Sequence, residues 1–573
     1  MSIADWSVLV IYLAGTVCVG VFLGRYIKNS SDMFAAGGQS PWWISGLSAF
    51  MTMFSANTFV VWGGIAYRHG VVAIAINLCY GIAAIACGFT VAGKWKRMGI
   101  ETPADYIEKR FGRSAVHFYT WFMMVFRIVG TGGALYAIAR LTLAVMGGEG
   151  SANASLSGTH LTIAILVFAV IVVGYTMIGG LWAVLMTDTL QFIILNLAVL
   201  FVIPLALARA GGFSAFLEKA PAGFLAITND KYTFLFLAGW VAIHYFMIGA
   251  DWAFVQRYLC VPTPKDARKS TFLFGGLYLL SPFLWLLPPL LWRVQQPIPA
   301  GADPETVTHM AETAYIMSCK AVLPIGMLGL MLAALFSATA SMISSQLNVF
   351  SGVLTENIYK PLAQNPSDKQ MVRMGRFFTL LLGVAIALIA MGTPHVGGAA
   401  KLIIAITQVM ATPLLAPTLF GLFAPRMGTR AIWITAGICF PLGLLVKFTD
   451  LFKGTLIADS TFTGVFLPLI IISVVILLSR KESPGWAAIQ ALTSRESKRQ
   501  PPQSSAFPAL IVSISLVASA VTLLALIPLN DTSRGLLAGF ACVLLALAAL
   551  LFVFSRRIKQ TKINTHDHRS ADK

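Results

Sequence analysis

Long apolar runs separated by short polar connections dominate the pattern of this chain. A helix needs about 20 residues to cross a hydrocarbon core of about 30 Å, and the runs have this length. The runs are continuous, whereas the strands of a membrane β-barrel alternate in segments of about ten residues. We therefore expect an all-α polytopic membrane protein with about fifteen spans, at residues 4–24, 43–67, 70–93, 115–147, 160–179, 181–208, 235–256, 271–292, 323–355, 377–392, 402–423, 431–446, 461–479, 507–528 and 535–555.

The composition agrees with lipid as the main solvent. Of the 573 residues 57% are hydrophobic and 11% are charged, and the mean hydropathy is +0.79. A soluble domain has about 25% charged residues. No span run contains a phosphate loop, a zinc motif or a nucleophile elbow, so we expect no enzyme activity.

The positive charge of the chain indicates its orientation. The chain has 41 Lys and Arg against 23 Asp and Glu, and a net charge of +18. About 29 of the basic residues fall in loops on the side of the C-terminal tail and about 10 on the other side. Because basic loops stay cytoplasmic, we expect a multi-pass protein of the cell inner or plasma membrane, with the N-terminus outside and the C-terminus in the cytoplasm. Its partner is then the lipid bilayer, with no nucleic acid and no obligate protein partner.

Two expected spans carry polar residues at mid-depth. The second contains Ser55, Asn57 and Thr58, followed by the helix-weakening pair Gly63-Gly64, and the seventh contains His244, Gly249 and Asp251. The two spans are five apart in order and so run antiparallel, as an inverted five-plus-five repeat requires. Breaks in such helices free backbone groups that can bind an ion or a solute. The alternative is that the glycines only allow neighbouring helices to pack closely.

The ninth span has a face of hydroxyl groups. Ser337, Ser341, Ser344 and Ser345 follow a helical spacing and share this face. Oxygen ligands suit a hard cation such as Na⁺. Asp188, beyond a hairpin expected at Gly179-Gly180, could supply the compensating charge. The alternative is serine bonding to carbonyl groups of its own helix.

A central run of the sequence resembles a known family. Residues 175–191 (YTMIGGLWAVLMTDTLQ) are similar to the signature of the sodium:solute symporter family, which includes sodium/sugar, sodium/proline and sodium/sialic acid cotransporters. Shorter matches are Ala36-Gly37-Gly38 before Trp42-Trp43, Thr102-Pro103-Ala104-Asp105-Tyr106 before Arg110-Phe111, Val255-Gln256-Arg257-Tyr258, Leu332-Ala333-Ala334-Leu335-Phe336 and Gly421-Leu422-Phe423. The resemblance covers about residues 1–480.

The resemblance implies a LeuT-like core of ten helices in two inverted repeats, with one extra N-terminal helix and about four extra C-terminal helices. It implies a secondary active symporter, Na⁺-coupled, that imports a small polar organic solute by alternating access. The expected parts are an N-terminal helix and loop (1–42), the two repeats (43–208 and 209–425), additional helices (426–480), a cytoplasmic loop (481–506), two further helices (507–556) and a cytoplasmic tail (557–573).

The resemblance also implies ligands for sodium. In the family, one site uses main-chain carbonyls, here those of Met51, Phe54 and Ala338, together with two hydroxyls, here Ser341 and position 342. Position 342 is Met342, whose thioether is a poor ligand for a hard cation. A second site of some members maps to Asp188, Ser341, Ser344 and Ser345. Three alternatives remain: a weakened first site that still binds Na⁺, coupling through the Asp188 group alone, or proton coupling through Asp188, Asp251 or His244.

By the same resemblance the solute pocket lies between the broken helices. Its expected residues are Ser55, Thr58, Asn77, His244, Met247, Tyr278 and Gln408. Neutral donors and acceptors such as Thr58 and Asn77 fit a hydroxylated solute, and we favour a sugar or sugar-like compound. Met247 and Tyr278 replace an aromatic residue and a lysine that are common in the sugar-transporting members.

Arg127, in the middle of the fourth span, supports an alternative solute. A buried guanidinium needs an acidic partner or an anionic ligand. If Arg127 faces the pocket it clamps a carboxylate, and the solute is an organic acid. If it pairs with Asp251 its role is structural. A different class of function, a solute sensor without transport, is also open because of Met342 and the extra C-terminal helices.

Overall fold

The computed structural model describes residues 1–24, 38–146, 158–363, 366–396, 399–449, 451–452, 454–459, 461–496, 507–530 and 534–571. Within these ranges the regular structure is helical and there is no β-strand, which confirms the expected all-α class. The helical class fits the apolar composition, because in lipid a helix satisfies its backbone hydrogen bonds internally.

The elements follow one another with short connections. The first half contains α1 (Ile3–Gly24), α3 (Trp42–Met53), η2 (Thr58–Trp62), α4 (Gly63–His69), α5 (Val72–Thr90), α6 (Ala92–Arg97), α7 (Pro103–Phe111), α8 (Arg113–Met146), α9 (Gly158–Ala210), α10 (Gly212–Lys219), α11 (Phe234–Ala250), α12 (Trp252–Leu259) and α13 (Pro264–Trp285). The second half contains α14 (Leu287–Gln295), α15 (Pro304–Val322), α16 (Met327–Val353), η3 (Leu354–Tyr359), α17 (Lys360–Leu362), α18 (Asp368–Gly392), η4 (Thr393–Val396), α19 (Ala399–Phe423), α20 (Thr429–Phe448), η5 (Leu456–Ala458), η6 (Phe462–Phe466), α21 (Leu467–Leu478), α22 (Pro484–Glu496), α23 (Phe507–Leu526), η7 (Ile527–Leu529) and α24 (Arg534–Ala571).

Many of these helices are long and apolar enough to cross a membrane. Ten in the described part meet this criterion, and there are up to twelve if the bent pairs α3 with η2–α4 and α11 with α12 are each one span. Three shorter apolar helices, Ile3–Gly15, Thr159–Gly174 and Phe462–Leu478, fall in three further expected spans. The polytopic architecture is confirmed. The count of about fifteen spans is not confirmed and stays a prediction.

We expected a hairpin between the fifth and sixth spans, but no helix ends at this point in the structure. α9 is continuous from Gly158 to Ala210 and includes Gly179-Gly180, so the boundaries 160–179 and 181–208 are wrong at this point. Glycine weakens a helix by about 1 kcal/mol relative to alanine, which does not outweigh the cost of leaving backbone groups unpaired in an apolar environment. The side chains of residues 178–184 lie outside the described part.

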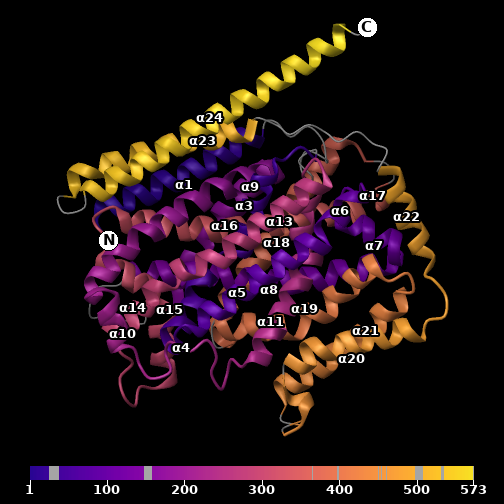
Figure 1. Cartoon of the computed structure of the whole chain (residues 1–573), viewed down its shortest axis with the longest axis horizontal. Coiled ribbons are helices and arrows are strands. Elements are labelled where there is room, and N and C mark those ends of the chain that lie inside the picture. Colours follow the sequence, from indigo (N-terminus) through magenta and orange to yellow (C-terminus); the bar gives the residue numbers. More distant parts are fainter. Residues whose placement is uncertain are drawn as a thin grey trace.

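The two bent pairs lie in the centre of the bundle. α3 packs against α9, α13 and α16, and α11 packs against α5 and α19 (Figure 1). Helices in corresponding positions of the two expected repeats also contact one another, since α5 packs on α13 and α8 on α16. One large apolar cluster joins these helices, and it includes residues at both bends, such as Phe54 and Trp252.

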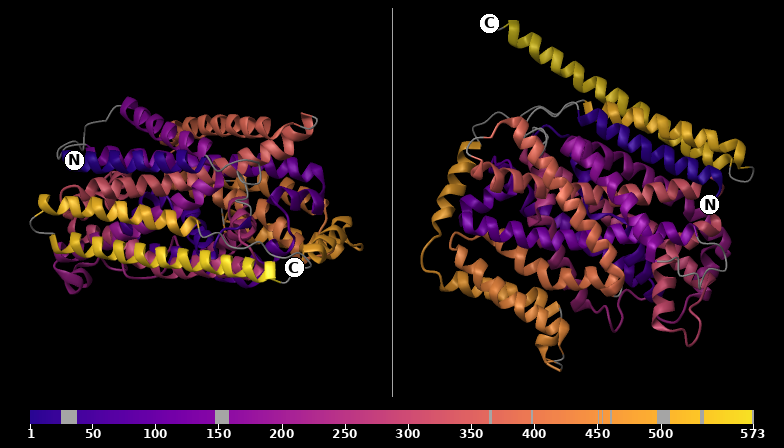
Figure 2. Two further views of the ribbon diagram at one scale, coloured as in Figure 1. Left: turned by 90° about the horizontal axis from the view of Figure 1, so that it is seen from above. Right: turned by 180° about the vertical axis from the view of Figure 1, so that it is seen from behind.

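The additional C-terminal helices lie at opposite edges of the bundle. α23 and α24, in yellow, run along α1, whereas α20 and α21, in orange, lie at the other edge (Figures 1 and 2). A separate apolar cluster that includes Val8, Phe201, Leu516 and Leu544 joins α1, α9, α23 and α24. α1 is also tied to the start of α16, because Asp5 Oδ1 accepts a hydrogen bond of 3.1 Å from the Gly329 amide. The expected loop 481–506 contains α22, and α24 continues through most of the expected tail.

Candidate functional site

The first helix break lies between α3 and η2, at residues 54–57, where the axis bends by 58°. Hydroxyl oxygens accept hydrogen bonds from the amides that the break leaves without a helical partner. The pairs are Ser55 N–H to Thr58 Oγ1 (3.4 Å), Ala56 N–H to Thr339 Oγ1 (2.9 Å) and Asn57 N–H to Ser55 Oγ (3.2 Å). Without water, such amides would otherwise carry a large desolvation cost. Ser55 and Thr58, which we expected to contact the solute, thus stabilise the broken helix.

The break lies before the glycine pair that we expected to weaken this span. Gly63 begins α4 and Gly64 lies within it, so the span does not break at this pair. A Cβ atom at Gly64 would lie 3.2 Å from the carbonyl oxygen of Ala311. Gly64 therefore serves the close packing of α4 on α15, which was the alternative interpretation.

The second break is at Asp251, between α11 and α12, with a bend of 51°. Asp251 Oδ1 accepts a hydrogen bond of 3.1 Å from the Ala253 amide and caps α12. The last carbonyls of α11 are also satisfied: Tyr258 donates to the Ile248 carbonyl and Trp95 Nε1 to the Gly249 carbonyl, both at 2.8 Å. The segment around His244 and Asp251 is thus a broken helix, as expected, and the two carbonyls already have donors.

Arg127 on α8 reaches the second break. Its Nε donates to Asp251 Oδ2 at 2.6 Å, and both side chains are buried. The structural pair that we considered as the alternative role of Arg127 is therefore present. The Nη2 atom of Arg127 is buried and, within the described residues, has no hydrogen-bond partner. One donor of this guanidinium remains for a further acceptor.

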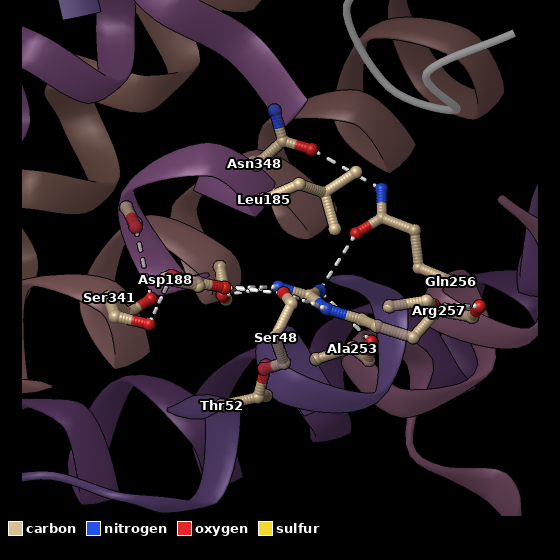
Figure 3. Close-up of polar contacts among 12 residues, drawn as sticks. Ser48, Thr52, Leu185, Asp188, Ala253, Gln256, Arg257, Ser341 and Asn348 are labelled. Carbon is tan, nitrogen blue, oxygen red and sulfur yellow. Dashed lines mark hydrogen bonds and ion pairs between the residues drawn. The ribbon is translucent and has the colours of Figure 1, made fainter. Parts of the chain in front are cut away.

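A polar cluster around Asp188 forms where α3, α9, α12 and α16 meet (Figure 3). The carboxylate of Asp188 is completely buried and accepts hydrogen bonds from the hydroxyls of Ser48 and Ser341. Arg257 Nη2 lies 3.7 Å from Asp188 Oδ2 and donates to Ser345 Oγ at 2.6 Å. The cluster therefore combines one carboxylate, three hydroxyls and one guanidinium, and all of these side chains are completely buried.

The structure brings three of the four expected residues of the second sodium site into this cluster. Asp188, Ser341 and Ser345 belong to it directly, whereas the hydroxyl of Ser344 donates to the carbonyl of Ser341 at 3.0 Å. Ser344 thus bonds to its own helix, as the alternative interpretation of the serine face proposed.

Sequence reasoning missed Arg257, Ser48 and Thr339. Arg257 lies just beyond the expected end of the seventh span, and the sequence alone gave it no partner. The available signal was Asp188 itself, since a buried carboxylate requires a nearby cation. Ser48 and Thr339 had weaker signals, because one is a single serine in an apolar run and the other lies off the serine face of its span.

Two of the residues expected to form the conventional sodium site, Met51 and Ser341, already make other contacts. The Met51 carbonyl accepts a hydrogen bond of 3.2 Å from the Phe54 amide, and the Ser341 hydroxyl donates to Asp188. Ala338 is completely buried on α16. A carbonyl oxygen has a second lone pair, and a hydroxyl can rotate to present its oxygen. The Met51 carbonyl and the Ser341 hydroxyl, which donates its proton to Asp188, therefore both keep lone pairs that could bind Na⁺.

The expected solute residues form two groups. Tyr80 contacts the rings of both His244 and Tyr278, with centroids 3.8 Å and 5.2 Å away, and His244 Nδ1 lies 2.7 Å from the Trp240 carbonyl. Met247 is buried, and Asn77 donates to the Ala73 carbonyl of its own helix at 2.8 Å. This part is filled by side chains. Gln408, in contrast, lines a cavity that also touches η2.

This cavity, which we call the vestibule, has a volume of about 490 Å³. It is bounded by η2, α4, α11, α15, α19, α20 and the loop before α11. Its lining residues are Val60, Val61, Gly64, Ile65, Arg68, His69, Lys231, Tyr232, Phe236, Thr308, Ala311, Glu312, Ile404, Gln408 and Lys447. The vestibule thus reaches the broken helix at η2, next to a residue expected to contact the solute.

Comparison with known proteins identifies the family. A model described as the sodium:solute symporter family matches residues 33–435, most of the chain. The chain belongs to the sodium:solute symporter family. A relative described as a sodium/glucose cotransporter from Vibrio parahaemolyticus is 28% identical over 484 residues, which cover 79% of this chain and 86% of the relative. Sodium/glucose cotransporter 1 from Ovis aries is 26% identical over 492 residues, covering 79% and 73%.

Solved structures agree with this assignment at the level of the fold. A Na⁺-coupled sialic acid symporter, in a substrate-bound outward-open state, superposes with a TM-score of 0.68 and 22% identity, covering 88% of this chain and 99% of that one. Mhp1, a nucleobase-cation-symport-1 family transporter with bromovinylhydantoin bound, gives a TM-score of 0.53 and 12% identity, covering 81% and 99%. The protein is therefore a multi-pass membrane transporter with the LeuT-like fold, and not an enzyme. Its family supports Na⁺-coupled symport.

Proposed function

We propose that this protein imports a small polar organic solute by Na⁺-coupled alternating access, with the N-terminus outside and the C-terminus in the cytoplasm. The observation that carries the proposal is the Asp188 cluster, a buried carboxylate with serine hydroxyls beside the first helix break. Carboxylate and hydroxyl oxygens are the ligands that a hard cation prefers. The names of the relatives, which specify sodium, support the choice of ion.

Binding of Na⁺ at this cluster would add a second cation to it. The Ser341 hydroxyl donates its proton to Asp188 and keeps oxygen lone pairs for the ion. Na⁺ would also share Asp188 with the guanidinium of Arg257, 3.7 Å away. Two cations on one carboxylate repel each other, so entry of Na⁺ would weaken the contact between α9 and α12. This exchange couples ion binding to the second broken helix, since α12 is its second half.

The solute of this proposal is sugar-like. The relatives with glucose in their names and the neutral groups near the breaks favour such a compound. An organic acid is the second candidate, and its support is the buried Nη2 of Arg127, which has no partner within the described residues. A carboxylate could accept a hydrogen bond from Nη2 while Nε keeps its hydrogen bond to Asp251.

Proton coupling remains the alternative mode of energy supply, because Met342 removes one oxygen from the conventional sodium site.

Na⁺ binding to the purified full-length protein tests the ion site directly. A ligand that binds the folded state raises the unfolding temperature with concentration, so Na⁺ should stabilise the protein relative to choline at constant pH and ionic strength. We expect Ser345→Ala to reduce this stabilisation. Ser513→Ala is the matched control, because Ser513 is buried in α23 and bonds to the Ala548 carbonyl, far from the cluster. Equal stabilisation of the parent by Na⁺ and choline would contradict sodium coupling.

A further inference from the structure

The charges that line the vestibule are mostly positive. Arg68 from α4, Lys231 from the loop before α11 and Lys447 from α20 line the cavity, and Glu312 from α15 is its one carboxylate among the described residues. The topology prediction places this face outside, where the positive-inside rule gives no reason for basic residues. About ten Lys and Arg fall in the loops of this face, and three of them meet at one cavity.

No ion pair between Arg68 and Glu312 reduces the positive charge of the vestibule in the described residues. Arg68 Nε and Glu312 Oε1 are buried and have no hydrogen-bond partner in the described part of the chain, and no ion pair within 4.0 Å joins the two residues there. Lys231 is exposed, with its ammonium 5.4 Å from the centroid of the Tyr232 ring. Arg68 and Lys231 therefore line the cavity, and in the described part of the chain neither forms an ion pair with Glu312 within 4.0 Å.

The acidic residues of the same face lie elsewhere for a structural reason. Asp303 caps α15 by accepting from the Thr306 amide at 2.9 Å, and Asp459 caps η6 by accepting from the Phe462 amide at 2.9 Å. Asp230, next to Lys231, is exposed and does not line the cavity. The face as a whole has both signs of charge, but Asp303, Asp459 and Asp230 lie outside the cavity lining, so the vestibule has a positive excess.

We propose that the vestibule is an anion-collecting entry site and that it binds a carboxylate through Arg68 and Lys231. A concave wall of one sign concentrates opposite charge and raises its rate of arrival. A guanidinium and a carboxylate also have complementary geometry. The vestibule ends at Val60 and Val61 of η2 and at Gln408, so an anion bound there is next to the broken helix. This inference rests on the proposed transport function and narrows its solute to a sugar acid or another organic acid.

Charged thiol reagents test the vestibule without transport. Thr308 lines the cavity and is partly exposed, so Thr308→Cys reports its potential. Ala300→Cys, exposed on the same face and outside the cavity, is the matched control. The background is the full chain with the two exposed cysteines, Cys18 and Cys542, replaced by Ser. The measurement is the ratio of labelling rates by an anionic and a cationic methanethiosulfonate of similar size.

We expect this ratio at Thr308→Cys to exceed the control ratio by about tenfold at low salt and to fall toward it at high salt. Arg68→Gln and Lys231→Gln should each lower the ratio, and Glu312→Gln should raise it. A ratio equal to the control, or one that Arg68→Gln does not change, would overturn the proposal. Because no transport is measured, this result is independent of whether the proposed Na⁺ coupling fails.

Protection of the same cysteine tests the carboxylate. Sodium gluconate should slow labelling of Thr308→Cys by the anionic reagent more than sodium chloride at equal ionic strength, and more than sodium chloride with added glucose. The difference should disappear in Arg68→Gln. If gluconate protects no better than the two controls, the vestibule has a general positive field but no carboxylate site, and the inferred solute class is wrong.

Discussion

The pairing of Asp188 with Arg257 is the strongest constraint at the level of single residues. Both side chains are completely buried, so the loss of one partner leaves an uncompensated charge, at a cost of about 3–5 kcal/mol. We expect Asp188→Asn and Arg257→Gln each to lower the unfolding temperature of the purified protein. The double variant should be less destabilised than the sum of the two, because both charges are absent. Additive losses in this cycle would mean that the two residues do not interact.

Met342 permits a second prediction at this scale. A serine in its place restores the hydroxyl that the conventional sodium site of the family has. Met342→Ser should therefore increase the stabilisation by Na⁺ at subsaturating concentration, whereas Met342→Leu, the matched apolar control, should not. If Met342→Ser has no effect while Ser345→Ala abolishes the Na⁺ response, coupling through the Asp188 group alone is favoured.

At the level of elements, the second break depends on side chains from other helices. Trp95 on α6 donates to the Gly249 carbonyl at the end of α11, and its side chain is completely buried. Trp95→Phe keeps the aromatic packing but leaves this carbonyl without its donor, at a cost of about 1–3 kcal/mol. We expect a lower unfolding temperature for Trp95→Phe and no change for Trp433→Phe, since Trp433 is exposed on α20. Equal effects would show that the hydrogen bond does not stabilise the break.

The elements also show what the sequence could and could not predict. Polar residues in apolar spans located both broken helices, because such residues are costly in lipid and have few other roles. The exact break at residues 54–57 depended on Thr339 of α16, a contact between residues 283 positions apart. The role of Arg257 depended in the same way on packing between distant segments. Helix periodicity contains no information about such contacts.

At the level of the whole molecule, the charge of the vestibule should depend on pH. Glu312 lies on α15, outside the candidate spans, and burial raises its pKa, which Arg140 and Arg68 oppose in part. His69, which lines the vestibule, Tyr136, Tyr232 and His309 are other titratable groups near it, and burial and Arg140 lower the pKa of His309.

As the pH falls through the raised pKa, Glu312 becomes neutral and the vestibule more positive. The anionic-to-cationic labelling ratio at Thr308→Cys should therefore rise with falling pH. The ionisation of the cysteine affects both rates equally and cancels in the ratio. In Glu312→Gln the ratio should be high and independent of pH over the same range. A pH dependence that persists in Glu312→Gln would assign the effect to another group.

The central claim, Na⁺-coupled symport, is tested most directly by solute uptake into proteoliposomes that contain the purified full-length protein. Radiolabelled glucose and gluconate are supplied outside, with an inward gradient of Na⁺ or of choline at the same pH and ionic strength. The account predicts that solute accumulates inside the proteoliposomes with a Na⁺ gradient and not with a choline gradient. This accumulation should be reduced in Ser345→Ala and retained in Ser513→Ala. Uptake that is the same with choline as with Na⁺ would contradict it.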